Sequence, residues 1–257
     1  CGNMASAIIG GAVSSDFLKG EDICVFDIDT EKADLFSKKY GVSCCASAEE
    51  TAKNSEFVVL AVKPQVFPTV LPTIKDCLGD TVLVSIGAGK TLGYIGGFLP
   101  DSAHIVRVMP NINAKVGASM SAVCKNSNTS DKELGFVKAL CCSFGEVTEL
   151  DESQFALFGV IAGCSPAYSY MFIDSMAREA VKCGMKKDEA LKICAQAVLG
   201  SAKMILEDKE HNPWALINSV CSPGGTTIEG VAKLQEKGFD TAVMDAVRAS
   251  LEKDKKL

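Results

Sequence analysis

At residues 57–64 the chain reads Phe-Val-Val-Leu-Ala-Val-Lys-Pro, a continuous apolar run that stops at a lysine and a proline. A strand with one solvated face alternates apolar and polar residues, whereas a parallel strand covered on both faces is apolar throughout. Two further runs of this kind follow, at Val82–Ile86 and Ile105–Met109. We therefore expect a sheet whose central strands are buried on both faces.

Helical patterns separate these expected strands. A shorter strand is expected at Ile23–Phe26, and two more at Ala118–Val123 and Glu146–Leu150. Helices are expected at residues 4–13, 30–40, 48–54, 66–78, 91–98 and 130–143. The alternation predicts an α/β fold, a doubly wound, mostly parallel Rossmann sheet with right-handed crossovers. Such sheets bind ligands outside the carboxyl ends of their strands.

The chain begins Cys-Gly-Asn-Met-Ala, and Gly2 and Ala5 match the second half of the G-x-G-x-x-G/A dinucleotide fingerprint. We expect its first glycine and first strand to precede residue 1. Asp27 ends a strand 25 residues after Gly2, where a ribose-binding carboxylate is expected. A plain helix start is the alternative for Gly2 alone. The predicted cofactor-binding residues are Gly2, Asn3, Met4, Asp27, Ala61, Val62, Lys63, Pro64, Ala88, Gly89, Met109 and Asn111.

Strand patterns stop at Leu150, so we expect a dinucleotide-binding domain at 1–150 and a helical domain at 151–257. Ser165-Pro166 is typical of a helix start, with the serine as N-cap and the helix running to about Cys183. Further helices are expected at Lys187 to about Asp208, after residue 225, and at Ala242–Glu252. The apolar surface of these helices favours a dimer over a self-sufficient bundle.

At residues 219–230 the chain reads Ser-Val-Cys-Ser-Pro-Gly-Gly-Thr-Thr-Ile-Glu-Gly, directly before an apolar helical pattern. Hydroxyls and the unpaired N–H groups of a helix start suit a small anion. The stretch holds no lysine or arginine, so an anion there is bound by neutral donors. An ordinary capped helix after a Pro-Gly turn is the alternative.

Composition excludes several classes of protein. The net charge of -6 argues against non-specific binding to nucleic acid. The sequence shows no uninterrupted apolar run approaching the roughly 20 residues of a membrane span. With 12 cysteines, 2 histidines and no C-x-x-C, we expect no metal site but reduced thiols and a cytoplasmic protein.

Six segments together resemble the pyrroline-5-carboxylate reductase family over the whole chain. They are Cys-Gly-Asn-Met-Ala-Ser-Ala-Ile at 1–8, Leu-Ala-Val-Lys-Pro-Gln at 60–65, Val-Ser-Ile-Gly-Ala-Gly at 84–89, Arg-Val-Met-Pro-Asn at 107–111, Ser-Pro-Ala-Tyr at 165–168 and Ser-Pro-Gly-Gly-Thr-Thr at 222–227. The resemblance implies a Rossmann domain followed by a helical dimerisation domain. It also implies an oxidoreductase that makes proline from 1-pyrroline-5-carboxylate with NADPH or NADH, as a homodimer assembling into a decamer.

The same resemblance implies the substrate site. Thr227 is placed to contact the ring nitrogen, as the catalytic residue. The substrate carboxylate is expected at Ser222 and the N–H groups of Gly225, Thr226 and Thr227, with Glu210 nearby. A solvated surface acid is the alternative for Glu210.

Two stretches depart from the family pattern. A Gly-Ser-Gly run usually precedes Ser-Pro, whereas this chain has Ala162-Gly163-Cys164-Ser165. After Phe26 the chain has Asp27-Ile28-Asp29-Thr30, where members that favour NADPH often offer an arginine or small hydroxyls. Family precedent favours NADPH, and the two carboxylates favour NADH.

Two other functions remain open. A β-hydroxyacid dehydrogenase shares the two-domain plan, but its catalytic lysine has no counterpart within Pro166–Ala180. A non-catalytic nucleotide-sensing protein would not need the anion-binding pattern of Ser222–Thr227.

Overall fold

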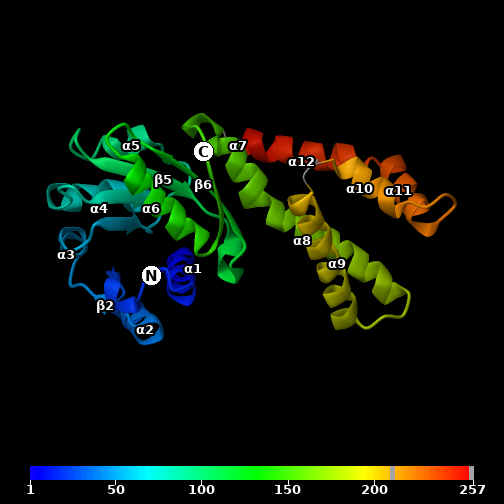
Figure 1. Ribbon diagram of the computed structural model, residues 1–257, viewed down its shortest axis with the longest axis horizontal. Coiled ribbons are helices and arrows are strands. Elements are labelled where there is room, and N and C mark those ends of the chain that lie inside the picture. Colours follow the sequence, from blue (N-terminus) through cyan, green and yellow to red (C-terminus); the bar gives the residue numbers. More distant parts are fainter. Residues whose placement is uncertain (209–211, 255–257) are drawn as a thin grey trace. The chain divides into compact units, whose positions relative to one another are not determined.

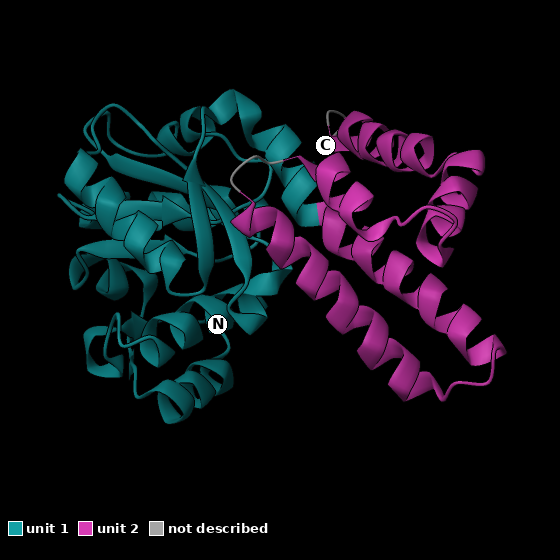
Figure 2. Ribbon diagram, turned by 45° about the vertical axis from the view of Figure 1, so that its right-hand side comes forward, with its two compact units in different colours: residues 1–163, 257 teal, residues 164–256 magenta. Residues whose placement is uncertain are grey.

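The computed structural model describes residues 1–208 and 212–254. They form two compact units, one comprising Cys1–Gly163 and the other beginning at Cys164 (Figure 2). Strands and helices alternate in the first unit, and the described part of the second is built from helices (Figure 1).

The strands of the first unit form two sheets, a five-stranded one in the order β3-β4-β5-β6-β7 and a two-stranded one of β1 and β2. The strands are β1 (Cys24–Val25), β2 (Ser43–Cys44), β3 (Phe57–Leu60), β4 (Val82–Ser85), β5 (His104–Met109), β6 (Ser119–Lys125) and β7 (Gly145–Glu149). Neighbouring strands are parallel except β5 and β6. The predicted mostly parallel sheet is confirmed. Strand β2 was not predicted, because it is only two residues long and both residues are exposed, which leaves no apolar pattern.

The helices of the first unit are α1 (Asn3–Ser14), α2 (Thr30–Tyr40), α3 (Ala48–Lys53), α4 (Phe67–Ile74), α5 (Leu92–Gly96), α6 (Asp131–Cys142) and α7 (Phe155–Phe158), with short 3₁₀ turns between them. Helix α2 has the predicted bounds because Asp29 caps its start and Gly41 ends it with a φ of 70°. The remaining helices begin and end within a few residues of their predicted bounds.

Two apolar clusters lie on the two faces of the five-stranded sheet. Val82 and Val84 of β4 pack with α1 and α6, whereas Leu83 between them packs with α4 and α5. Side chains of a strand alternate between faces. This explains why β4 is buried at every position.

The first unit continues past the predicted boundary at Asp151 to Gly163. Phe155 is fully buried against Ala122 and Cys124 of β6, so the helical residues 152–163 pack on the sheet that they follow. Helical pattern alone places such a segment with the helices that follow it.

The second unit contains α8 (Ser165–Lys182), α9 (Lys187–Glu207), α10 (Pro213–Val220), α11 (Thr226–Glu236) and α12 (Phe239–Asp254). Helix α10 was not predicted. The N-cap role predicted for Ser165 is wrong, because the π-helical turn η6 (Gly159–Cys164) runs directly into α8 and Ser165 is already helical. Tyr168 Oη lies 2.5 Å from Ser250 Oγ and ties α8 to α12.

The helices of the second unit bury few of their own residues. Only Pro166, Ala177 and Ala190 are buried among the described residues of α8–α12. Large apolar side chains are exposed instead, among them Met171, Leu199, Trp214, Val220 and Met244. Among the described residues, the helical stretch Glu152–Lys182 is also long and apolar enough to cross a membrane, by length and composition alone.

Candidate active site

Helix α1 begins at the edge where the carboxyl ends of the strands lie. Its N-cap is Gly2, which offers no side-chain cap, and a Cβ at Gly2 would meet nothing within 4 Å. The first N–H groups of a helix have no partner within it. This 12-residue helix therefore presents unpaired N–H groups and open space, as a pyrophosphate requires.

Asp27 lies beside this helix start. Cys1 packs with Val25 of β1, and the Asp29 N–H donates to Asp27 Oδ1 at 2.9 Å. Burial raises the pKa of Asp27, whereas the hydrogen bond from the Asp29 N–H and the charge of Lys32 lower it. Asp27 is thus an ionised acceptor next to Gly2, as the expected ribose-binding role requires.

Asp29 and Lys32 form an ion pair at the start of α2. Asp29 Oδ1 accepts the Lys32 N–H at 3.3 Å, and its Oδ2 lies 2.8 Å from Lys32 Nζ. The hydrogen bond from Lys32 lowers the pKa of Asp29. Between the two carboxylates, Ile28 is 92% exposed. Lys32 is exposed to solvent, and its charge is engaged by Asp29.

The loops after β3 and β4 follow the same edge. Val62 and Lys63 are exposed, and Pro64 opens a 3₁₀ turn. After β4, a Cβ at Gly87 would collide with the ring of buried Phe67, and Gly89 has a φ of 71°. Only glycine fits both positions. The backbone of the exposed residues Ala88 and Gly89 is therefore open to close approach by a ligand.

The loop after β5 differs from expectation in its side chains. Asn111 is 7% exposed, and its Nδ2 donates to the Ala162 carbonyl at 2.9 Å. A Cβ at Gly159 would lie 3.1 Å from Met109 Sδ. Both Met109 and Asn111 thus direct their side chains at residues 159–162.

In the second unit, the predicted anion site has the expected local geometry. The turn before α11 is closed by the Gly225 N–H, which donates to the Ser222 carbonyl at 3.0 Å. Gly225 is the N-cap of α11 and offers no side-chain cap. A Cβ at Gly225 would collide with Ser222 Oγ, so this hydroxyl lies against the helix start.

One expected donor is occupied. Because the Gly225 N–H is used within the turn, an anion would find Ser222 Oγ and the N–H groups of Thr226 and Thr227. Ser222 and Thr227 are exposed, and neither side-chain hydroxyl has a hydrogen-bond partner among residues 1–208 and 212–254. Glu210 lies outside the described residues.

Metal-ligating residue types and buried thiols both occur among residues 1–208 and 212–254. No group of three or more His, Cys, Asp or Glu residues is placed there to hold a metal ion. Burial raises the pKa of the Cys124 and Cys141 thiols to about 12, so neither is a thiolate at neutral pH.

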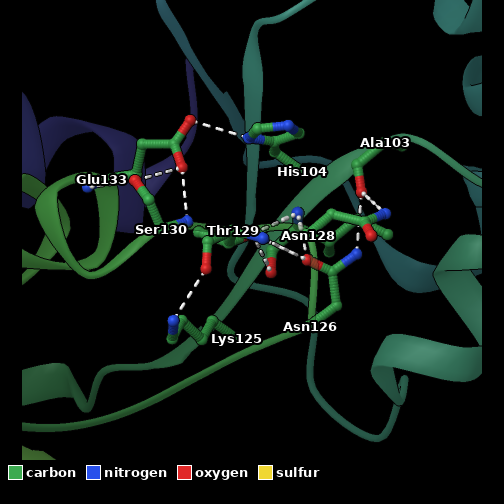
Figure 3. A network of polar contacts seen from close by, with 9 residues as sticks. Ala103, His104, Lys125, Asn126, Asn128, Thr129, Ser130 and Glu133 are labelled. Carbon is green, nitrogen blue, oxygen red and sulfur yellow. Dashed lines mark hydrogen bonds and ion pairs between the residues drawn. The ribbon is translucent and has the colours of Figure 1, made fainter.

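A dense polar network lies at the opposite end of β5 (Figure 3). His104 Nδ1 is 2.7 Å from Glu133 Oε1, and the other Glu133 oxygen accepts the Ser130 N–H. Asn126 Oδ1 accepts the Thr129 hydroxyl at 2.7 Å. The network closes the turn between β6 and α6 and caps α6, so its role is structural.

The sequence also missed a buried ion pair. Arg107 of β5 is 5% exposed, and its Nη1 donates to Glu152 Oε1 at 3.0 Å. The signal was present in the sequence, because Arg107 is a charged residue inside the apolar run Ile105–Met109.

Comparison with known proteins covers both units. Residues 152–257 match the family model described as pyrroline-5-carboxylate reductase dimerisation, and residues 1–89 match that of an NADP oxidoreductase, coenzyme F420-dependent. A pyrroline-5-carboxylate reductase of Escherichia coli is 41% identical, with 100% of this chain and 96% of the relative covered. That of Aquifex aeolicus is 38% identical, with 100% and 94% covered.

Solved structures are similar over the same span. The Plasmodium falciparum pyrroline carboxylate reductase with NADP bound has a TM-score of 0.87 at 30% identity, covering 99% of this chain and 94% of that one. A pyrroline-5-carboxylate reductase from Coxiella burnetii has a TM-score of 0.93 at 29% identity, covering 99% and 95%.

Proposed function

Because the chain belongs to the pyrroline-5-carboxylate reductase family, we propose that it reduces 1-pyrroline-5-carboxylate to L-proline with NADPH or NADH, the last step of proline biosynthesis. One observation carries this proposal: relatives of that name at 41% and 38% identity match 100% of this chain. The reaction adds one hydride to the imine carbon and one proton to the nitrogen, and the dinucleotide leaves oxidised.

The first unit fits a dinucleotide. The uncapped start of α1 supports a site for its pyrophosphate, and the ionised Asp27 beside it supports a site for a ribose hydroxyl pair. Gly87 and Gly89 allow the backbone after β4 to approach closely. The bound nicotinamide would supply the hydride, and the protein supplies binding and orientation.

The second unit carries the proposed substrate site. Ser222 Oγ and the first N–H groups of α11 would bind the substrate carboxylate, since they are neutral donors at the positive end of a helix dipole. The Thr227 hydroxyl would donate to the ring nitrogen as it gains electron density. Glu210 stays a prediction. Fixing the imine carbon against the hydride donor is the main catalytic device, and no covalent intermediate is required.

We propose a homodimer through the second unit, assembling into a decamer. The exposed apolar side chains of α8–α12 support association, as does the match to a dimerisation family. Because exposed apolar side chains support association between subunits, we also assign the apolar stretch Glu152–Lys182 to protein contacts instead of lipid. The net charge of -6 argues against a nucleic-acid partner.

We also propose a cytoplasmic location. All the cysteines are free thiols, as is usual where glutathione and thioredoxin keep thiols reduced.

Separate assays with two kinds of substrate distinguish the proposed activity from that of a β-hydroxyacid dehydrogenase. The purified protein should oxidise NADPH or NADH with 1-pyrroline-5-carboxylate and should not reduce the dinucleotide with 3-hydroxyacids. Oxidation of 3-hydroxyacids without imine reduction would overturn the proposal. Dinucleotide binding without either reaction would favour a nucleotide sensor.

A further inference from the structure

Arg107 is a charged side chain inside the sheet of the first unit. It projects from β5, is 5% exposed, and its guanidinium carbon lies 4.5 Å from the centre of the buried Phe155 ring. A buried charge is costly unless it is paired and hydrogen-bonded. Its partner is Glu152, whose Oε1 accepts from Arg107 Nη1 at 3.0 Å.

The same carboxylate oxygen has a second donor. Glu152 Oε1 accepts the backbone N–H of Leu92 at 2.7 Å. Leu92 is the first residue of α5, and its N–H is one that the helix itself leaves unpaired. One carboxylate thus joins β5 to the start of α5, and it comes from a residue 60 positions after Leu92.

Leu92 also ends the loop that follows β4. That loop contains the exposed Ala88 and Gly89, and it begins at Gly87, which lies against the Phe67 ring. Its near end is therefore fixed by packing and its far end by the hydrogen bond to Glu152. Between these two points Gly89 adopts a φ of 71°, so the loop has one defined shape.

We propose that Glu152 is a positioning residue for the dinucleotide site, holding the loop 87–91 in its binding shape while touching neither cofactor nor substrate. Arg107 acts through Glu152 by fixing its carboxylate. This inference rests on the proposed function, since it assumes that the loop binds a dinucleotide. Removing the carboxylate leaves the loop's far end held only by the Thr91 cap and the packing of Leu92, so ordering the loop costs binding free energy.

Direct titration of NADPH and NADH into the full-length protein tests the proposal. In Glu152→Ala the Kd for the dinucleotide should rise about tenfold, which corresponds to the usual scale of energetic coupling between neighbouring groups. Glu152→Gln keeps an acceptor oxygen for the Leu92 N–H and should stay within about twofold of wild type. A purely structural role would lower the urea midpoint of unfolding and leave the Kd unchanged.

The matched control is Glu149→Ala, a nearby carboxylate that pairs with Lys138 at 3.3 Å on the surface and holds no loop. It should bind dinucleotide as wild type does. Leu92→Pro supplies a second arm if Glu152→Ala does not fold, because proline is tolerated at the first position of a helix and removes the N–H. It also removes the packing of the Leu92 side chain, for which Leu92→Ala is the control. Leu92→Pro should also raise the Kd for the dinucleotide.

Folded Glu152→Ala or Leu92→Pro with wild-type Kd would overturn the positioning role and leave the proposed function intact. An equal rise in the Kd of Glu149→Ala would also overturn the positioning role, because it would indicate a general effect of charge. Wild-type protein that binds neither dinucleotide would overturn both inferences.

Discussion

The Gly225 N–H donates to the Ser222 carbonyl at 3.0 Å, and this bond closes the turn from which α11 starts. It brings Ser222 Oγ against the uncapped helix start. Neutral donors thus converge where a small carboxylate would bind, without a lysine or arginine in the stretch 219–230.

Removing either hydroxyl should impair turnover. Ser222→Ala and Thr227→Ala should each lower kcat/KM about ten- to a hundredfold, since a hydrogen bond to a charged group contributes about 1.5–3 kcal/mol. Steady-state kinetics measures the loss. Ser219→Ala is the control, because Ser219 Oγ donates to the Leu216 carbonyl within α10. Wild-type kinetics in both active-site variants would remove this stretch from the substrate site.

The apolar face of the second unit should hold subunits together. Leu199 of α9 is 62% exposed, so Leu199→Glu places a charge in the expected interface and should shift the full-length protein towards monomer in sedimentation equilibrium. Leu35→Glu, at a position 63% exposed on α2 of the first unit, should leave the assembly unchanged. A wild-type monomer at micromolar concentration would contradict the dimer.

Cofactor preference should follow Asp27. Its carboxylate can accept from the ribose hydroxyls of NADH but faces a second negative charge in NADPH, which costs on the order of a few kcal/mol at about 4–5 Å. Lys32 offers little relief because Asp29 holds its ammonium at 2.8 Å. We predict use of both dinucleotides with the lower KM for NADH, and reversal in the double variant Asp27→Ser, Ile28→Arg. A tenfold or greater advantage for NADPH in wild type would refute this role of Asp27.

Acid should weaken the network around Glu133. Burial alone would raise its pKa, but hydrogen bonds from Ser130 and His104 outweigh burial and lower the pKa from 4.5. A lowered folded-state pKa contributes stability above the unfolded value, and that stability is lost as pH falls through the folded pKa. Urea midpoints measured below pH 5 should therefore fall less steeply in Glu133→Gln than in wild type. Parallel curves would contradict the assignment.

Much of the first unit could be predicted because its signals are local. Asp29 and Gly41 fix both ends of α2, and the burial of Leu83 on one face and Val84 on the other explains the apolar run Val82–Val84 of β4. The site residues at strand ends followed from topology, which brings the carboxyl ends of parallel strands to one edge.

The features that could not be predicted from the sequence involve contacts between residues far apart in the chain. Nothing local signals that Glu152 bonds to Leu92, or that the Asn111 amide turns inward to Ala162. Nor does a local signal show that Phe155 is buried against β6. The π-helical turn before Ser165 has no sequence signature comparable to a cap.

The central claim is that this chain delivers a hydride to the imine carbon of 1-pyrroline-5-carboxylate. Reduced dinucleotide carrying deuterium at the transferable position should be incubated with the imine and wild-type protein, and the product examined by NMR. The account predicts L-proline with deuterium at ring carbon 5, formed as the dinucleotide is oxidised. Oxidation of the dinucleotide without labelled proline, or no oxidation at all with either NADPH or NADH, would contradict it.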